Sequence, residues 1–131
     1  MEVRISDCRL HYEEAGSGEP LVLLHGNGED CGYFVRQVEY FSAKYRVIAL
    51  DTRGHGKSER GFAPFTIAQF AEDLRQALEK IASEPVHLLG FSDGGNIAMA
   101  FALRWPKLLR SLILNGANLR PSGVKFSVQA P

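Results

Sequence analysis

The sequence predicts an α/β fold in three layers, built on a mostly parallel sheet of about six strands. Two observations lead to this prediction. The runs 21–24 and 47–50 are apolar without alternating polar residues, which is typical of strands buried on both faces of a parallel sheet. Segments with helical periodicity separate such runs, and strands alternating with helices indicate an α/β sheet. The length of 131 residues suits one domain, residues 1–131.

The first three strands are expected close together at the start of the chain. Residues 3–5 and 9–12 read as two short strands of a hairpin. The turn Gly-Ser-Gly-Glu-Pro at 16–20 ends the second of them. The buried run 21–24 is the third strand. We expect the first pair to be antiparallel and the later strands parallel.

The first helix and the fourth strand come next. Phe34, Val38 and Phe41 recur at helical spacing, which predicts a helix over about 33–44. The apolar run 47–50 is then the next buried strand.

A second helix begins with a capping signal. Thr66, followed three residues later by Gln69, forms the pattern of a capping box. The apolar stripe of an amphipathic helix comes after it, formed by Ile67, Phe70, Ala71, Leu74, Leu78 and Ile81.

The last predicted elements are a strand at 86–89, a helix at 95–103 and a sixth strand at 111–114. The helix stops before Pro106, which cannot continue it. Residues 117–131 show little periodicity and are expected to form a loop.

Composition excludes several classes of protein. Fifteen basic and fifteen acidic residues cancel, so the chain lacks the charge excess of a nucleic-acid-binding protein or of one attracted to acidic membranes. No apolar stretch approaches the ~20 residues of a membrane span, and the N-terminus has no signal-peptide core. We therefore expect a cytoplasmic protein with neither nucleic-acid nor membrane partners.

Cysteine and histidine spacing predicts neither a metal nor a cofactor. Cys8 and Cys31 lack C-x-x-C spacing and are interpreted as reduced thiols, with a disulfide as the alternative. The histidines stand singly, without metal-ligand spacing, at His11, His25, His55 and His87.

The most informative motif is Gly-Phe-Ser-Asp-Gly at 90–94, between the strand 86–89 and a helix. In this context G-x-S-x-G is a nucleophile elbow, a strained turn that exposes the serine hydroxyl. Bulk at Gly90 or Gly94 would collide with the neighbouring strand and helix. The N–H groups and the positive dipole end of the helix point to the same place, which suits a developing oxyanion. Ser92 is thus the candidate nucleophile.

Two further motifs stand after the third and fourth strands. They are His-Gly-Asn-Gly at 25–28 and Asp-Thr-Arg-Gly-His-Gly-Lys-Ser at 51–58. With the elbow, in this order and at this spacing, the chain resembles the first half of an α/β-hydrolase over about residues 1–120. The residues 90–95 are similar to those of the esterase/amidase branch that includes valacyclovir-hydrolase-like enzymes.

The resemblance implies three site residues and a small-molecule acyl substrate. Ser92 would attack the acyl carbonyl of an ester, thioester or amide. The backbone N–H groups of Asn27 and Asp93 would form the oxyanion hole, and the Asp93 carboxylate would point away. The alternative for Ser92 is a tight turn with an idle hydroxyl.

Other polar residues are interpreted as structural, with direct chemistry as the alternative. The resemblance implies that His25 braces the oxyanion loop, while Asp51, Arg53 and His55 form a hydrogen-bonded corner. His87 lies in a predicted buried strand and is read as a core histidine whose ring nitrogens are satisfied.

The tripeptide Gly-Lys-Ser at 56–58 does not indicate a nucleotide site. A phosphate loop needs glycine at position 51, which is Asp51, and a helix after the serine, where 59–64 read Glu-Arg-Gly-Phe-Ala-Pro.

The resemblance also implies that a complete triad has an acid and then a histidine later in the chain than the serine. Here the sixth strand leads into Asn-Gly-Ala-Asn at 115–118, and no histidine comes after His87. We expect a domain without strands seven and eight and without a cap, either a fragment or a natural half-length product. Alone it would be weakly active or inactive.

Three functional hypotheses remain open at this point. The chain is a serine hydrolase completed by a missing segment, or one completed by a partner chain that supplies acid and histidine, or a catalytically dead module that binds small molecules or self-associates. A homodimer or larger homo-oligomer is expected, because the sixth strand would leave an unpaired edge.

Overall fold

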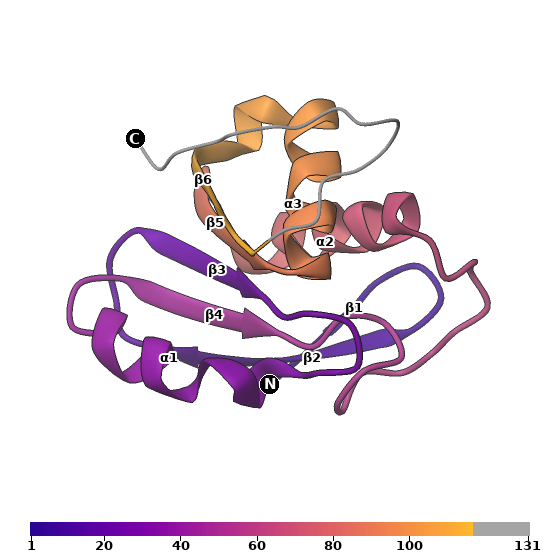
Figure 1. Cartoon of the computed structure of the whole chain (residues 1–131), viewed down its shortest axis with the longest axis horizontal. Coiled ribbons are helices and arrows are strands. Elements are labelled where there is room, and N and C mark those ends of the chain that lie inside the picture. The colour runs from indigo at the N-terminus through magenta and orange to yellow at the C-terminus, as the bar shows by residue number, and fades with distance from the viewer. Residues whose placement is uncertain (117–131) are drawn as a thin grey trace.

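The computed structural model describes residues 1–116, which form a six-stranded sheet with helices on both faces (Figure 1). The strands are β1 (Glu2–Arg4), β2 (Arg9–Ala15), β3 (Pro20–Leu24), β4 (Arg46–Leu50), β5 (Val86–Phe91) and β6 (Leu109–Asn115). The α-helices are α1 (Val35–Phe41), α2 (Ile67–Ile81) and α3 (Asp93–Arg104), and the 3₁₀ turns are η1 (Cys31–Phe34) and η2 (Pro106–Leu108). The loop expected at 117–131 lies outside the described residues.

The strand order is β1-β2-β4-β3-β5-β6. β2 pairs antiparallel with both β1 and β4, whereas β3 through β6 are mutually parallel. Leu24 pairs with Leu50 on one side and with Gly90 on the other, and Gly90 pairs with Leu114. The carboxyl ends of four strands therefore meet at one edge of the sheet, where ligands bind in open α/β sheets.

The sheet separates two apolar layers, which confirms the predicted three-layer fold. All five residues of β3 are buried, and successive side chains enter opposite layers. Val22 and Leu24 pack on the side covered by α2 and α3, while Leu21 and Leu23 pack on the side of η1 and α1 (Figure 1).

The first helix differs from the prediction of a helix over 33–44. A 3₁₀ turn begins at Cys31 because the Asp30 side chain accepts a hydrogen bond from the Gly32 N–H at 2.8 Å. α1 then ends at Phe41, whose carbonyl accepts from the N–H groups of Lys44 and Tyr45. The capping box at Thr66 is half formed: its hydroxyl accepts from the Gln69 N–H at 3.1 Å, but the Gln69 side chain donates to Asp73 instead.

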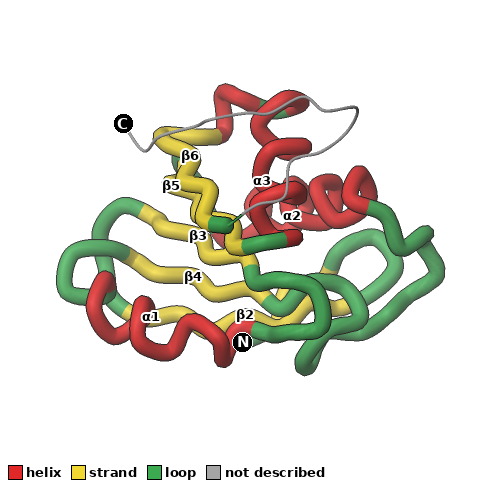
Figure 2. Tube along the Cα trace, in the orientation of Figure 1, coloured by secondary structure: helices red, strands yellow, loops and turns green. Residues whose placement is uncertain are grey.

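A long loop without helix or strand joins β4 to α2 (Figure 2). Its anchor is Arg53, whose side chain is fully buried. The guanidinium donates two hydrogen bonds to Asp73 on α2, at 2.8 and 2.9 Å, and two to Asp7 after β1, each at 2.7 Å. Hydrogen bonds from Arg53 hold the pKa of Asp7 well below its ordinary value of 3.8. Arg53 is thus a structural residue that ties this loop to two other segments.

Two further observations concern the described residues. Cys8 and Cys31 are free thiols and belong to opposite sides of the sheet. Within residues 1–116, no helix has both the length and the apolar character needed to cross a bilayer.

Candidate active site

Ser92 occupies the sharp turn between β5 and α3. Its backbone has φ 56° and ψ −119°, and it is the one non-glycine residue with positive φ in the part of the chain that the structure describes. Such a conformation typically costs ~1–3 kcal/mol, so the surroundings must enforce it. The Ser92 N–H donates to the Asn115 carbonyl at 3.1 Å, and the Ser92 carbonyl accepts from the Gly95 N–H at 2.8 Å. The turn has the geometry of a nucleophile elbow.

Gly90 and Gly94 must be glycine because backbone atoms of neighbouring segments occupy the space that a side chain would need. A Cβ atom on Gly94 would lie 2.2 Å from the Leu24 carbonyl oxygen at the end of β3. A Cβ atom on Gly90 would lie 2.3 Å from the Gly94 carbonyl oxygen. Both contacts are far closer than van der Waals separation and involve backbone, which cannot swing aside. They account for the predicted requirement for glycine on both sides of Ser92.

The loop after β3 lies directly beside the serine. A Cβ atom on Gly26 would be 3.2 Å from the Cβ atom of Ser92. The Glu29 side chain accepts a hydrogen bond from the Gly26 N–H at 3.1 Å, and the Glu29 N–H donates to the Gly26 carbonyl at 3.2 Å. Asn27 is exposed at the tip of this turn, and Gly28 follows with φ 79°.

His25 braces this loop and is not available as a base. Its Nε2 accepts a hydrogen bond from the Thr52 N–H at 3.1 Å, so this nitrogen carries the lone pair. The proton of the neutral ring is therefore on Nδ1, which donates to the Gly26 carbonyl at 2.7 Å. Burial lowers the pKa of His25, which keeps the ring neutral.

The other three histidines are also engaged away from Ser92. His55 lies within hydrogen-bond distance of the Thr52 hydroxyl and stacks on Phe65. His11 contacts Glu13 through Nε2. His87 is only half-buried, but both of its ring nitrogens have partners, as predicted: Nδ1 contacts the Ser111 hydroxyl on the neighbouring strand at 2.6 Å, and Nε2 contacts Glu19 at 2.8 Å.

Asp93 is the first residue of α3. Its carboxylate accepts a hydrogen bond from the Asn96 side chain at 3.2 Å, on the helix itself. The first N–H groups of a helix have no intrahelical acceptor, so the backbone N–H of Asp93 is suited to bind an oxyanion. The roles of Ser92, Asn27 and Asp93 in such a site stay predictions.

Asp51 links the two loops that flank the site. Its carboxylate accepts from the Cys31 N–H at 2.7 Å and from the Lys57 N–H at 2.9 Å. Burial acts to raise the pKa of Asp51, but the N–H groups of Lys57 and Cys31 outweigh it and the pKa is lowered. Burial, with the neighbouring Asp51 carboxylate, raises the pKa of Cys31 to about 12, so this thiol is no rival nucleophile at neutral pH.

Two positioning residues of the site were not foreseen from the sequence. Glu29 closes the turn at Gly26, and Thr52 fixes the His25 ring. The only local signal for Glu29 is its spacing of three from Gly26, which matches a four-residue turn with Gly28 at positive φ. Thr52 carries no such signal, because its contact with His25 joins the ends of two adjacent strands.

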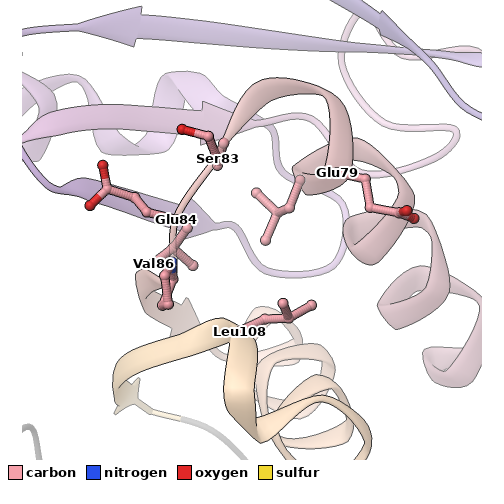
Figure 3. Close-up of a pocket in the computed structure, with 8 residues that line it drawn as sticks. Glu79, Ser83, Glu84, Val86 and Leu108 are labelled. Atoms are coloured by element: carbon pink, nitrogen blue, oxygen red, sulfur yellow. The ribbon is translucent and has the colours of Figure 1, made fainter.

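A cavity of about 260 Å³ lies at the other end of the sheet from Ser92 (Figure 3). It sits at the start of β5 and between α2 and η2, and its lining is Leu78, Glu79, Ala82, Ser83, Glu84, Pro85, Val86 and Leu108. It holds no part of the predicted site.

A mostly parallel sheet with a strained serine turn after its fifth strand defines a hydrolase-type α/β architecture. Residues 19–129 match the family model of the alpha/beta hydrolase fold, and the chain belongs to this family.

Individual relatives agree with this assignment. The (E)-2-((N-methylformamido)methylene)succinate hydrolase of Acinetobacter baylyi is 36% identical over 119 residues, which cover 90% of this chain and 45% of the relative. The 2-hydroxy-6-oxononadienedioate/2-hydroxy-6-oxononatrienedioate hydrolase of Paraburkholderia phymatum is 39% identical over 117 residues, 85% of this chain and 41% of the relative. A thermophilic esterase from Thermogutta terrifontis superposes with a TM-score of 0.87 at 31% identity, covering 94% of this chain and 48% of the esterase. The chain thus spans less than half the length of these relatives.

Proposed function

We propose that this chain carries the nucleophile and the oxyanion hole of a serine hydrolase for small-molecule esters, thioesters or amides. The observation that carries the proposal is the positive-φ turn at Ser92, enforced by backbone contacts at Gly90 and Gly94. Ser92 Oγ attacks the acyl carbonyl, and the N–H groups of Asn27 and Asp93 stabilise the oxyanion, each worth ~3 kcal/mol of transition-state stabilisation. The relatives are named as hydrolases, which supports hydrolysis in general, and the esterase among them supports an ester substrate.

The general base is proposed to come from outside residues 1–116. The sequence contains four histidines, and each has partners other than Ser92. A further segment of a longer protein or a partner chain would supply the acid and the histidine that withdraw the Ser92 proton. The 131-residue chain on its own is then weakly active or inactive.

This proposal predicts that the isolated chain barely hydrolyses p-nitrophenyl acetate and that Ser92→Ala changes the rate little. Added imidazole stands in for the absent base. It is expected to increase acetylation of Ser92, read by peptide mapping, well above acetylation of the exposed Ser83.

Two outcomes would contradict the proposal. Rapid turnover that disappears in Ser92→Ala would mean that a base lies within the chain. Acetylation of Ser92 no faster than that of Ser83, with imidazole present, would mean that the elbow does not activate the serine.

We also propose that the chain self-associates through the free edge of β6, which is the third hypothesis drawn from the sequence. Among the described residues, β6 pairs with β5 alone, and its Leu112, Ile113 and Leu114 are only half-buried. A hollow of about 410 Å³ adjoins it on the α1 side of the sheet, lined by Leu21, Phe41, Tyr45, His87, Leu89, Arg110, Ser111 and Ile113. A second copy related by a two-fold axis would pair with this edge and cover the hollow.

Light scattering at micromolar concentration is therefore expected to show a mass of at least twice 14.5 kDa for the 131-residue chain. Ile113→Lys places a charge in the hollow and is expected to shift the mass toward that of the monomer. Leu103→Lys on the exposed face of α3 is the matched control and should leave the mass unchanged. A well-folded monomer in the unmodified protein would refute the idea.

A further inference from the structure

Three side chains of metal-binding types converge on the α1 side of the sheet, outside the residues proposed for the hydrolase site. They are His11 and Glu13 of β2 and Cys31, the first residue of η1. One potential ligand atom from each lies within 4.8 Å of the others. Below they are called the β2–η1 cluster.

The backbone holds the members of the β2–η1 cluster together. His11 and Glu13 stand two apart on a strand and so project from the same face of the sheet. The Asp51 carboxylate accepts the Cys31 N–H at 2.7 Å, and Asp30 caps the turn that Cys31 begins. Cys31 is therefore fixed over β2 by residues that are not themselves in the cluster.

The cluster also has room for a ligand. It forms part of the lining of a cavity of about 460 Å³, which extends over Val35 and Val38 to Lys57. His11 is buried, whereas the Glu13 side chain is 56% exposed, so the cluster can be reached from solvent.

We propose that the β2–η1 cluster is a Zn²⁺ site with three protein ligands: His11 Nε2, Cys31 Sγ and a Glu13 carboxylate oxygen. Imidazole, thiolate and carboxylate are the ligand types of zinc, whereas Mg²⁺ and Ca²⁺ prefer oxygen alone. Zinc–ligand bonds of ~2.0–2.3 Å would place the three atoms ~3–4 Å apart, which modest side-chain rotation achieves from the observed separation. The fourth position, facing the cavity, is open to water.

Binding exchanges a proton for the metal. Zn²⁺ displaces the proton of the Cys31 thiol, which passes to solvent, while His11 binds through the Nε2 lone pair of the tautomer that carries its proton on Nδ1. Asp51 does not join the ligands, because both of its oxygens accept backbone N–H groups, from Cys31 and Lys57. It acts as a positioning residue for Cys31. The inference is independent of the chemistry proposed at Ser92.

Metal titration of the reduced, metal-free 131-residue chain tests the proposal. Zn²⁺ competed against a chromophoric chelator is expected to bind at one ion per chain. Co²⁺ in its place should give the near-ultraviolet absorption of a cobalt–thiolate bond and the visible bands of tetrahedral coordination. Loss of residues that merely orient ligands typically costs 10–100-fold in metal affinity, so Cys31→Ser should lower zinc affinity by ~100-fold or more and abolish the thiolate band.

Matched variants separate ligation from folding. Glu13→Gln changes an exposed side chain and should fold normally, yet weaken zinc binding by at least ~10-fold. Cys8→Ala removes the other thiol, on the far side of the sheet, and His87→Gln removes a histidine outside the cluster; both should keep the wild-type affinity. The proposal is overturned if the folded chain takes up no stoichiometric zinc, or if neither Cys31→Ser nor Glu13→Gln weakens the binding.

Discussion

Replacing Arg53 with methionine is expected to lower the free energy of unfolding by ~3–5 kcal/mol, as is typical when one partner of a buried ion pair is removed. Arg53 is fully buried, and Asp73 is only 2% exposed. Methionine fills much of the same volume but leaves the Asp73 carboxylate without its two hydrogen bonds from Arg53. It also releases Asp7, and with it the loop that Arg53 holds. Urea denaturation followed by circular dichroism measures the change.

The matched control is Arg9→Met. Arg9 also bonds a carboxylate twice, that of Glu59, but both side chains are largely exposed. Solvent screens such a pair, so little change in stability is expected. A loss for Arg53→Met as small as that for Arg9→Met would show that the buried ion pairs do not anchor the loop.

The unmodified protein and the Arg53→Met variant can also be compared in acid. The pKa of Asp7 is depressed in the folded state, so its stabilising contribution is complete above its ordinary value of 3.8 and is lost as the pH falls toward the lower folded value. The unmodified protein should therefore lose stability steeply below about pH 4. Arg53→Met lacks the partner that depresses this pKa, so its stability should fall less over that range.

Gly94→Ala is expected to destabilise the fold by ~3 kcal/mol or more, at the upper end of overpacking costs. Its new methyl group would lie 2.2 Å from the Leu24 carbonyl oxygen and 2.7 Å from that of His25. Both are backbone oxygens at the buried end of β3, so the clash can be removed only if α3 moves away from β3. That movement would carry Ser92 with it. Denaturant titration measures the cost, and acetylation of Ser92 in the presence of imidazole should fall in parallel.

Gly28→Ala provides the comparison. Gly28 has φ 79°, but no atom lies within 4 Å of the position its Cβ would take. An alanine there should cost only the strain of a left-handed backbone, ~1–2 kcal/mol. Gly94 has no left-handed backbone, so a loss for Gly94→Ala no larger than that for Gly28→Ala would mean that the close approach to β3 does not explain the glycine at the elbow.

The fold could be predicted because its main signals are local. Every residue of β3, and Val47 through Leu50 of β4, is buried, in agreement with the unbroken apolar runs. The elbow could also be predicted, because any side chain at position 90 or 94 would clash with backbone and both positions must therefore be glycine. The first helix was predicted too long for two reasons: Phe34 belongs to the 3₁₀ turn that the Asp30 cap begins, and the residues after Phe41 form a turn closed by hydrogen bonds to the Phe41 carbonyl.

The remaining features depend on contacts between distant residues. Arg53 meets Asp7 and Asp73, which lie 46 and 20 positions away, and no spacing rule connects them. The sequence predicted no metal site for the same reason. His11 and Cys31 stand 20 positions apart, and only the packing of η1 against β3 and β4, next to β2 in the sheet, brings their side chains into the proposed cluster.

The hydrogen bonds at His25 have a directional consequence for the peptide that joins Gly26 to Asn27. This peptide is trans and planar, so its N–H points opposite to its carbonyl. The carbonyl faces the two donors that hold it, His25 Nδ1 and the Glu29 N–H, and the Asn27 N–H must therefore face the other way. The neutral His25 ring, in a single tautomer, thus fixes the orientation of the Gly26–Asn27 peptide dipole in the folded protein. Binding a ligand would therefore cost no further free energy to order this peptide.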